Sequence, residues 1–148
     1  MTNIPANTSV YQKISIGQLN DAYRTGQRDF YFLEIIGKEE YPVVANLDFR
    51  DAMFYGCRFD SVTFDQIDFS HARFWDCNLR FAFFKSCNLS GSIWETCAWE
   101  YVSVVDSDMK GIRVLDQSEN YKAETIDRTV SFIEYVLNNG RSALNNPP

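Results

Sequence analysis

The 148-residue sequence is poor in the residue types from which catalytic sites are usually built. It has a single histidine, His71, and no glycine-rich phosphate loop, Cys-x-x-Cys pair or His-x-x-x-His spacing. Enzymes need a nucleophile, a base or a metal site held within reach of one another. We therefore expect no enzymatic activity, no metal site and no cofactor, and we expect His71 to be a solvated surface imidazole.

Positive charge and long apolar runs are also scarce. The chain has 14 Lys and Arg against 20 Asp and Glu, a net charge of −6. An acidic chain without a basic cluster does not bind nucleic acid by neutralising phosphates. The polar start, Met1 to Asn7, predicts neither a signal peptide nor a membrane span, so the expected location is cytoplasmic. In that compartment the four cysteines are expected to be reduced.

What the sequence does contain is an apolar residue at every fifth position. The series consists of Phe49, Phe54, Phe59, Phe64, Phe69, Phe74, Leu79, Phe84, Leu89, Trp94, Trp99, Val104, Met109 and Val114. Two positions before each lies a small or aliphatic residue, and all four cysteines occupy such positions. Neither the 3.6-residue period of a helix nor the two-residue period of a strand produces this pattern.

A longer period of twenty residues is superimposed on the first, because Cys57, Cys77 and Cys97 recur at that spacing. The units Ala45-Asn-Leu-Asp-Phe49, Cys77-Asn-Leu79 and Cys87-Asn-Leu89 resemble the pentapeptide-repeat family. That resemblance implies an all-β solenoid, a right-handed, four-sided parallel β-helix with one pentad per side. Residues 45–116 would then give about 3.5–4 turns at twenty residues per turn. The chain departs from the family motif where Met53, Thr63, Arg73, Phe83 and Ile93 replace its Asp or Asn.

The flanks divide the chain into three parts. Residues 1–44 are expected to form a flexible segment, a short helix opened by the Ser15 and Gln18 capping box, and an irregular first turn. Residues 45–116 form the β-helix, and residues 117–148 a linker, a helix over 123–139 and a disordered tail. The helix would dock through an apolar stripe of Ile126, Val130, Ile133 and Leu137. It would either cap the last turn or pair with a second copy.

Stacking at twenty residues also predicts two clusters of outward-facing apolar residues. One consists of Phe81, Phe83, Tyr101 and Val105, and the other of Met53, Tyr55, Trp75 and Ile93. Contiguous exposed clusters of this kind are typical of protein–protein contacts, although the chain's own flanks could cover them.

These features favour a non-enzymatic scaffold or adaptor that binds an unidentified protein, with a homodimer as one possible state. The alternative is a short DNA mimic that binds or protects DNA gyrase or another topoisomerase, as some family members do. A rod of about 17 Å, at the strand spacing of parallel turns, would match only about five base pairs.

The register makes one prediction about stability. Phe74 is at the centre of a pentad, so Phe74→Ala should lower the free energy of unfolding by about 3–5 kcal/mol, the usual loss for a buried aromatic side chain. Urea denaturation measures this loss. A value below about 1 kcal/mol would mean that the ring is exposed and that the register is shifted.

Overall fold

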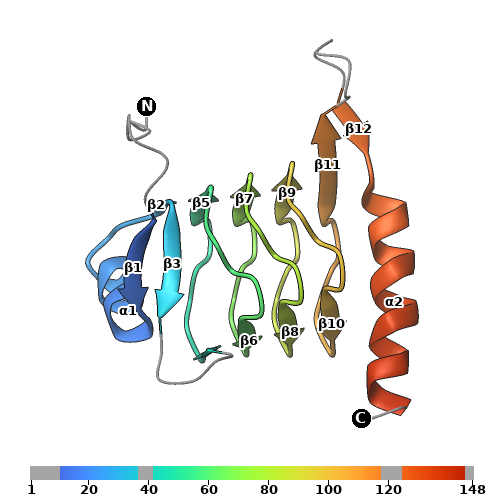
Figure 1. Cartoon of the computed structure of the whole chain (residues 1–148), viewed down its shortest axis with the longest axis horizontal. Coiled ribbons are helices and arrows are strands. Elements are labelled where there is room, and N and C mark those ends of the chain that lie inside the picture. Colours follow the sequence, from blue (N-terminus) through green and yellow to red (C-terminus); the bar gives the residue numbers. More distant parts are fainter. Residues whose placement is uncertain (1–10, 37–41, 118–124, 146–148) are drawn as a thin grey trace.

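The computed structural model describes residues 11–36, 42–117 and 125–145. The chain coils into a four-sided parallel β-helix with a helix at each end (Figure 1). Helix α1 (Ile16–Arg24) lies beside the first turn, and helix α2 (Thr129–Asn145) runs along the last one. The four-sided solenoid expected from the period of five is confirmed.

Two of the four sides are continuous parallel ladders of short strands. The first side contains β2 (Asp29–Tyr31), β5 (Met53–Tyr55), β7 (Arg73–Trp75), β9 (Ile93–Glu95) and β11 (Arg113–Gln117), with β12 (Thr125–Asp127) added antiparallel. The second contains β4 (Val43–Ala45), β6 (Thr63–Asp65), β8 (Phe83–Lys85) and β10 (Ser103–Val105). The other two sides are joined by bridges between single residues, such as Asp48 with Asp68 and Arg58 with Asn78.

The solenoid has about five turns, since five parallel strands stack on the first side. Residues 45–116 were expected to give about 3.5–4 turns, and an irregular first turn was expected before them; β2 and β3 (Leu33–Ile36) form a turn at that place. Phe30 pairs with Phe54, 24 residues away, whereas Phe54 pairs with Phe74 at the regular spacing of 20. This turn is longer than the others, so its apolar residues do not fall on the five-residue spacing of the regular pentads.

The core consists of columns of aromatic rings along the axis of the coil. Phe54 stacks on Phe74 with ring centroids 5.2 Å apart, and Phe64 stacks on Phe84 at 5.0 Å. Rings of adjacent sides meet edge to face, as Phe54 meets Phe59 at 5.4 Å. These distances match the spacing of about 4.8 Å between hydrogen-bonded strands, so backbone pairing and ring stacking support each other.

A positive φ angle occurs at each corner of the coil. The residues concerned are Asn46, Asp51, Gly56, Ser61, Gln66, His71, Asp76, Phe81, Ser86, Gly91, Thr96, Tyr101, Asp106 and Gly111. This left-handed conformation costs about 1–2 kcal/mol for a residue with a side chain, and glycine, asparagine and aspartate tolerate it best. The chain therefore has a second five-residue pattern, which is set by backbone sterics rather than by burial.

The Asp or Asn of the family motif directly precedes the central residue of a pentad. In this chain it occurs only at positions that differ by multiples of ten residues. On the bridged sides its side chain accepts the backbone N–H two residues later, as Asp68 does from Ser70 at 2.9 Å and Asn78 from Arg80 at 3.1 Å. On the laddered sides the same position is the first residue of a strand, as in Met53 of β5. Met53, Thr63, Arg73, Phe83 and Ile93 are therefore all on the laddered sides, whereas Arg58 and Ala98 lack the Asp or Asn on a bridged side.

At the N-terminal end the capping box is confirmed: Ser15 and Gln18 each accept the other's backbone N–H. Residues 1–14 were expected to be flexible, but Gln12–Ser15 forms strand β1, which pairs in parallel with β3. Residues 1–10 lie outside the described part of the chain. The apolar run of residues 30–36 is divided into β2 and β3 by Phe32, whose φ is 51°.

At the C-terminal end the helix begins later than predicted. Thr125–Asp127 forms β12, because it pairs with the free edge of β11, and α2 starts only at Thr129. The side chain of Asp127 accepts the N–H of Thr129 at 2.9 Å, which satisfies a free amide of the first helical turn. The helix also continues past Gly140, to Asn145, into the segment expected to be disordered.

The corners predict different effects for two glycine substitutions. Gly56 and Gly111 both have positive φ, 63° and 75°, but a Cβ at Gly56 would lie 2.5 Å from the Phe32 ring. At Gly111 the nearest atom would be 3.7 Å away. Gly111→Ala should cost about 1–2 kcal/mol from backbone strain alone. Gly56→Ala should cost a further 1–3 kcal/mol, roughly, from overpacking. Equal losses in urea denaturation would disprove the contact between Phe32 and Gly56.

Candidate interaction surface

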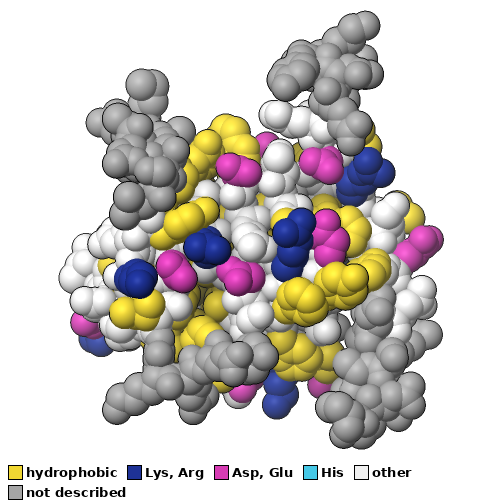
Figure 2. Space-filling model, in the orientation of Figure 1, with side chains coloured by type: hydrophobic (Ala, Val, Ile, Leu, Met, Phe, Trp, Pro, Cys, Tyr) yellow, Lys and Arg dark blue, Asp and Glu magenta, His cyan; other side chains and the backbone are white. Residues whose placement is uncertain are grey.

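The most exposed aromatic side chains of the described residues lie one above the other at a single corner of the coil. Phe81 is 59% exposed and Tyr101 64% exposed, and their rings stack in parallel with centroids 4.9 Å apart. We call these two residues the corner pair. Phe83, in the adjacent strand β8, is half-buried. The space-filling view shows hydrophobic side chains gathered on one face of the molecule, beside a few charged ones (Figure 2).

Val105 was predicted to belong to this surface, and that prediction is wrong. The side chain is only 6% exposed. It lies in β10, the last strand of its ladder, and α2 packs against that strand. The first cluster is therefore smaller than predicted, with its exposed part at the corner and not on the face of the strand.

The corner pair is unusual because of its backbone conformation. Phe81 and Tyr101 have φ angles of 60° and 62°, and the other corners of the pentad series carry glycine or small or polar residues. Phe32 is a further aromatic residue with positive φ, but its ring is 9% exposed and packs edge-on against Tyr55. At the corner pair, strain of the backbone is thus combined with exposure of the ring.

Contacts around the corner pair hold it in place. Arg80 and Glu100, which precede the two aromatic residues, form an ion pair of 3.1 Å across adjacent turns. The backbone N–H of Tyr101 donates to the hydroxyl oxygen of Tyr135 in α2 at 2.8 Å. Earlier in the same column, the Phe81 N–H donates to the carbonyl of Glu100 in the next turn. Tyr135 thus supplies the acceptor that a further turn would have provided.

The second predicted cluster is less exposed. Trp75 is 37% exposed, whereas Met53, Tyr55 and Ile93 are half-buried. The ring of Tyr55 lies edge-on to that of Trp75 at 5.2 Å and 6.2 Å from that of Tyr31 in the first turn. Neighbouring aromatic rings therefore cover much of this cluster, which makes it the weaker candidate.

Helix α2 covers the last turn, but not with the predicted stripe. Phe132 and Val136 are fully buried and Ile133 is partly buried, whereas Val130 is 69% and Leu137 47% exposed. The Phe132 ring lies 4.8 Å from that of Trp94 and 5.3 Å from that of Trp99. Ile126 belongs to β12 and contributes nothing to the helix face. Because the helix starts later and docks through Phe132, the predicted stripe is rotated away from the core.

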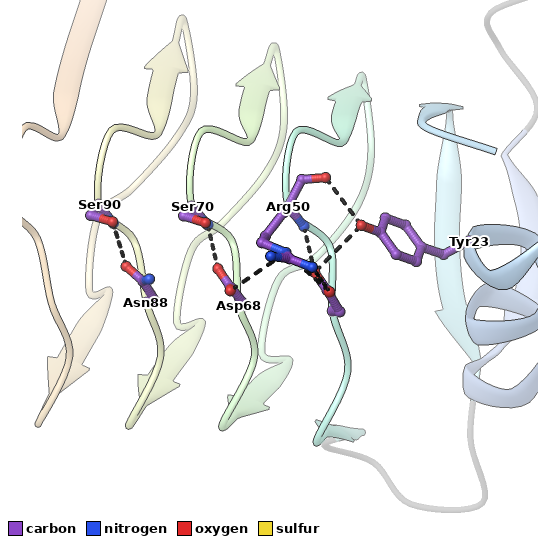
Figure 3. Close-up of polar contacts among 7 residues, drawn as sticks. Tyr23, Arg50, Asp68, Ser70, Asn88 and Ser90 are labelled. Atoms are coloured by element: carbon purple, nitrogen blue, oxygen red, sulfur yellow. Dashed lines mark hydrogen bonds and ion pairs between the residues drawn. The ribbon is translucent and has the colours of Figure 1, made fainter. Parts of the chain in front are cut away.

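A polar network joins α1 to the coil on the opposite side of the molecule (Figure 3). The Arg50 guanidinium lies 2.8 Å from Asp48 and 3.8 Å from Asp68, and the Tyr23 hydroxyl donates to the Arg50 carbonyl at 3.2 Å. Burial tends to raise the pKa of Asp48, but the hydrogen bonds and charge of Arg50 outweigh it and hold that pKa below its usual value. Arg50 thus balances the charge of Asp48, and the contacts of this network are structural.

His71 is exposed, and its ring lies over Gly91 of the next turn, where a Cβ would come within 2.5 Å of it. Among the described residues, no three His, Cys, Asp or Glu side chains are arranged to hold a metal ion. Neither helix in the described part of the chain combines the length and apolar character needed to cross a bilayer.

One comparison with known proteins matches the repeat itself. The model of the pentapeptide repeat region matches residues 47–122, just over half of the chain. Two solved structures are similar at 15% identity. One is a trypsin-treated variant of QnrB1, a plasmid-mediated fluoroquinolone resistance protein, with a TM-score of 0.35 over 62% of this chain and 52% of that one. The other is the pentapeptide repeat protein Rfr23 from the cyanobacterium Cyanothece 51142, with a TM-score of 0.28 over 64% and 60%. The chain thus spans only part of each, and no curated protein matches it.

The docked face of α2 can be tested by two substitutions. Phe132→Ala should lower the free energy of unfolding by about 3–5 kcal/mol, because it leaves a cavity against two tryptophans. Val130→Ala, on the exposed face, should change it by less than about 0.5 kcal/mol. Urea denaturation distinguishes the observed face from the predicted stripe, since the stripe requires the larger loss at Val130.

Proposed function

The chain belongs to the pentapeptide-repeat family, and on this basis we propose that it is a non-enzymatic scaffold that binds another protein through the corner pair. The single observation that carries the proposal is that Phe81 and Tyr101 are both strained and exposed. A bulky residue at a left-handed corner costs about 1–2 kcal/mol, and burial of the ring does not offset this cost here. Strain retained at an exposed position supports a functional role over a structural one.

The geometry of the pair is suited to an anchor. Its rings are already stacked at 4.9 Å, and the backbone of Tyr101 is held by Tyr135, so little conformational freedom is left to lose on binding. The ion pair of Arg80 and Glu100 lies beside it and supplies a polar rim. Interfaces commonly combine aromatic anchors with such a rim.

The DNA-mimic alternative has less support among the described residues. A mimic of duplex DNA needs a continuous row of negative charge, about one per 1.7 Å of axis. Here Asp48 is paired with Arg50, Glu95 with Arg73, and Glu100 with Arg80. Within the described coil, acidic groups on three of the four sides are thus balanced by neighbouring guanidinium groups, which interrupts such a row on those sides.

The proposal is tested by replacing Phe81 with the photo-crosslinking residue p-benzoylphenylalanine, identifying the crosslinked protein, and then measuring its affinity for purified variants. The double variant Phe81→Ser and Tyr101→Ser removes both rings and leaves the residue type that Ser61 already places in this column. It should fold normally and bind the partner roughly thirtyfold more weakly, which corresponds to about 2 kcal/mol.

Trp75→Ser is the matched control, because it removes an exposed aromatic side chain from the other cluster. Its affinity for the same partner should be unchanged. If the double variant binds as tightly as the native protein, the corner pair is not the contact surface. If Trp75→Ser is the variant that loses affinity, the second cluster has that role instead.

A further inference from the structure

Three of the four cysteines form a column within one corner of the coil. Cys57, Cys77 and Cys97 lie in successive turns of the coil. The residue after each of them, Arg58, Asn78 or Ala98, is paired with its counterpart in the neighbouring turn. Each thiol also donates to a carbonyl oxygen contributed by the turn before: Phe30 at 3.7 Å, Phe54 at 3.2 Å and Phe74 at 3.3 Å. The three Sγ atoms therefore point the same way, and each thiol is directly adjacent to the next.

The column is closed at one end and partly open at the other. Cys57 and Cys77 are 1% and 2% exposed, whereas Cys97, in the last complete turn, is half-buried. Burial, with the neighbouring thiols of Cys57 and Cys97, raises the pKa of Cys77 well above its usual value. Because Cys97 is the most exposed thiol of the column, an oxidant reaches it first.

Cys87 provides an internal comparison. It is buried, and its thiol donates to the Phe64 carbonyl at 3.2 Å in the same manner. Its column, however, contains Ile67 in the preceding turn and Ser107 in the following one, and the Ser107 hydroxyl accepts the Cys87 N–H at 2.9 Å. Cys87 thus has the same corner geometry without a neighbouring thiol.

Adjacent members of the thiol column are close enough to be joined. Residues in register on parallel strands have Cα atoms about 4.8 Å apart, within the roughly 4.4–6.8 Å that a disulfide spans. Side chains that project in parallel keep their Cβ atoms near the same spacing, slightly beyond the usual 3.5–4.5 Å, approximately. A disulfide here would carry some strain, and strained disulfides are reduced more easily.

We propose that Cys97 and Cys77 form a reversible oxidation site that takes hydrogen peroxide as its oxidant. The Cys97 sulfur attacks one peroxide oxygen, the O–O bond breaks, and water leaves once the departing hydroxide is protonated. The resulting sulfenic acid is attacked by the Cys77 sulfur: the S–S bond forms, the S–O bond breaks, and the Cys77 proton leaves with the hydroxide as a second water. Two thiols lose two electrons to one peroxide.

The site uses no residue of the proposed binding surface, and its effect would fall on the end of the coil that α2 covers. Oxidation removes the thiol donors to the Phe54 and Phe74 carbonyls and links two turns covalently. One of those turns carries Trp94, against which Phe132 of α2 packs. The bond would therefore join the last turn, and the helix docked on it, to the preceding turn.

The experiment treats the purified full-length protein with hydrogen peroxide, blocks free thiols, and maps disulfides by mass spectrometry. The expected product is monomeric, lighter by two hydrogen atoms, linked between Cys77 and Cys97, and restored by dithiothreitol. Cys97→Ser should slow loss of free thiols by about tenfold or more, because it removes the accessible member of the column. Cys87→Ser should leave the rate and the product unchanged.

Other products would overturn the proposal. These are a disulfide containing Cys87, a disulfide between two molecules, conversion of Cys97 to sulfinic acid without a disulfide, and no reaction in the folded state. The same treatment in urea shows whether the fold selects the pair. A mixture of pairings in urea and one pairing in the folded protein would support the site, whereas the same mixture in both would contradict it.

Discussion

The stacking of one turn on the next at the spacing of parallel strands is the constraint on which this structure depends. It requires the backbone bonds and the central rings to repeat at similar distances, and the separations of 5.0–5.9 Å between stacked central rings are close to the strand spacing. A turn of twenty residues follows, because four short sides enclose a space that one large residue from each side fills. The interior consequently consists of aromatic rings with aliphatic and small side chains beside them.

The corners are the consequence of bending a chain so tightly. Every fifth residue takes a left-handed conformation, and the two kinds of side close their corners differently. On bridged sides Asp68 or Asn88 closes the turn, whereas after laddered sides a thiol such as Cys77 donates to a carbonyl. The Asp and Asn side chains thus accept backbone N–H groups on the bridged sides, whereas the thiols donate to carbonyl groups in the middle of ladder strands. Phe81 and Tyr101 depart from this logic and do nothing comparable for the fold.

The sequence predicted those features that follow from the pentad register. The four sides, the inward rings and the capping box at Ser15 all depend on local spacing, which a single sequence displays. The pairing of the first turn, the start of α2 and the docked face of α2 do not depend on local spacing. They depend on which strand edges and apolar side chains remain uncovered once the coil has formed. The apolar surface of α2 is broad, with Phe132 and Val136 beside the stripe of Val130 and Leu137, so periodicity alone could not choose between them. Val105 was misplaced for the same reason, since only the docked helix buries it.

The end of the coil covered by α2 links these observations. The last turn of a solenoid has no further turn to cover its aromatic rings or to pair with its backbone groups. Helix α2 supplies both kinds of contact. Phe132 covers Trp94 and Trp99, while Tyr135 accepts the N–H of Tyr101. The same helix that protects the core thus fixes the backbone of an exposed aromatic residue. The stability of this end and the rigidity of the corner pair are therefore coupled, because both depend on one docked helix face.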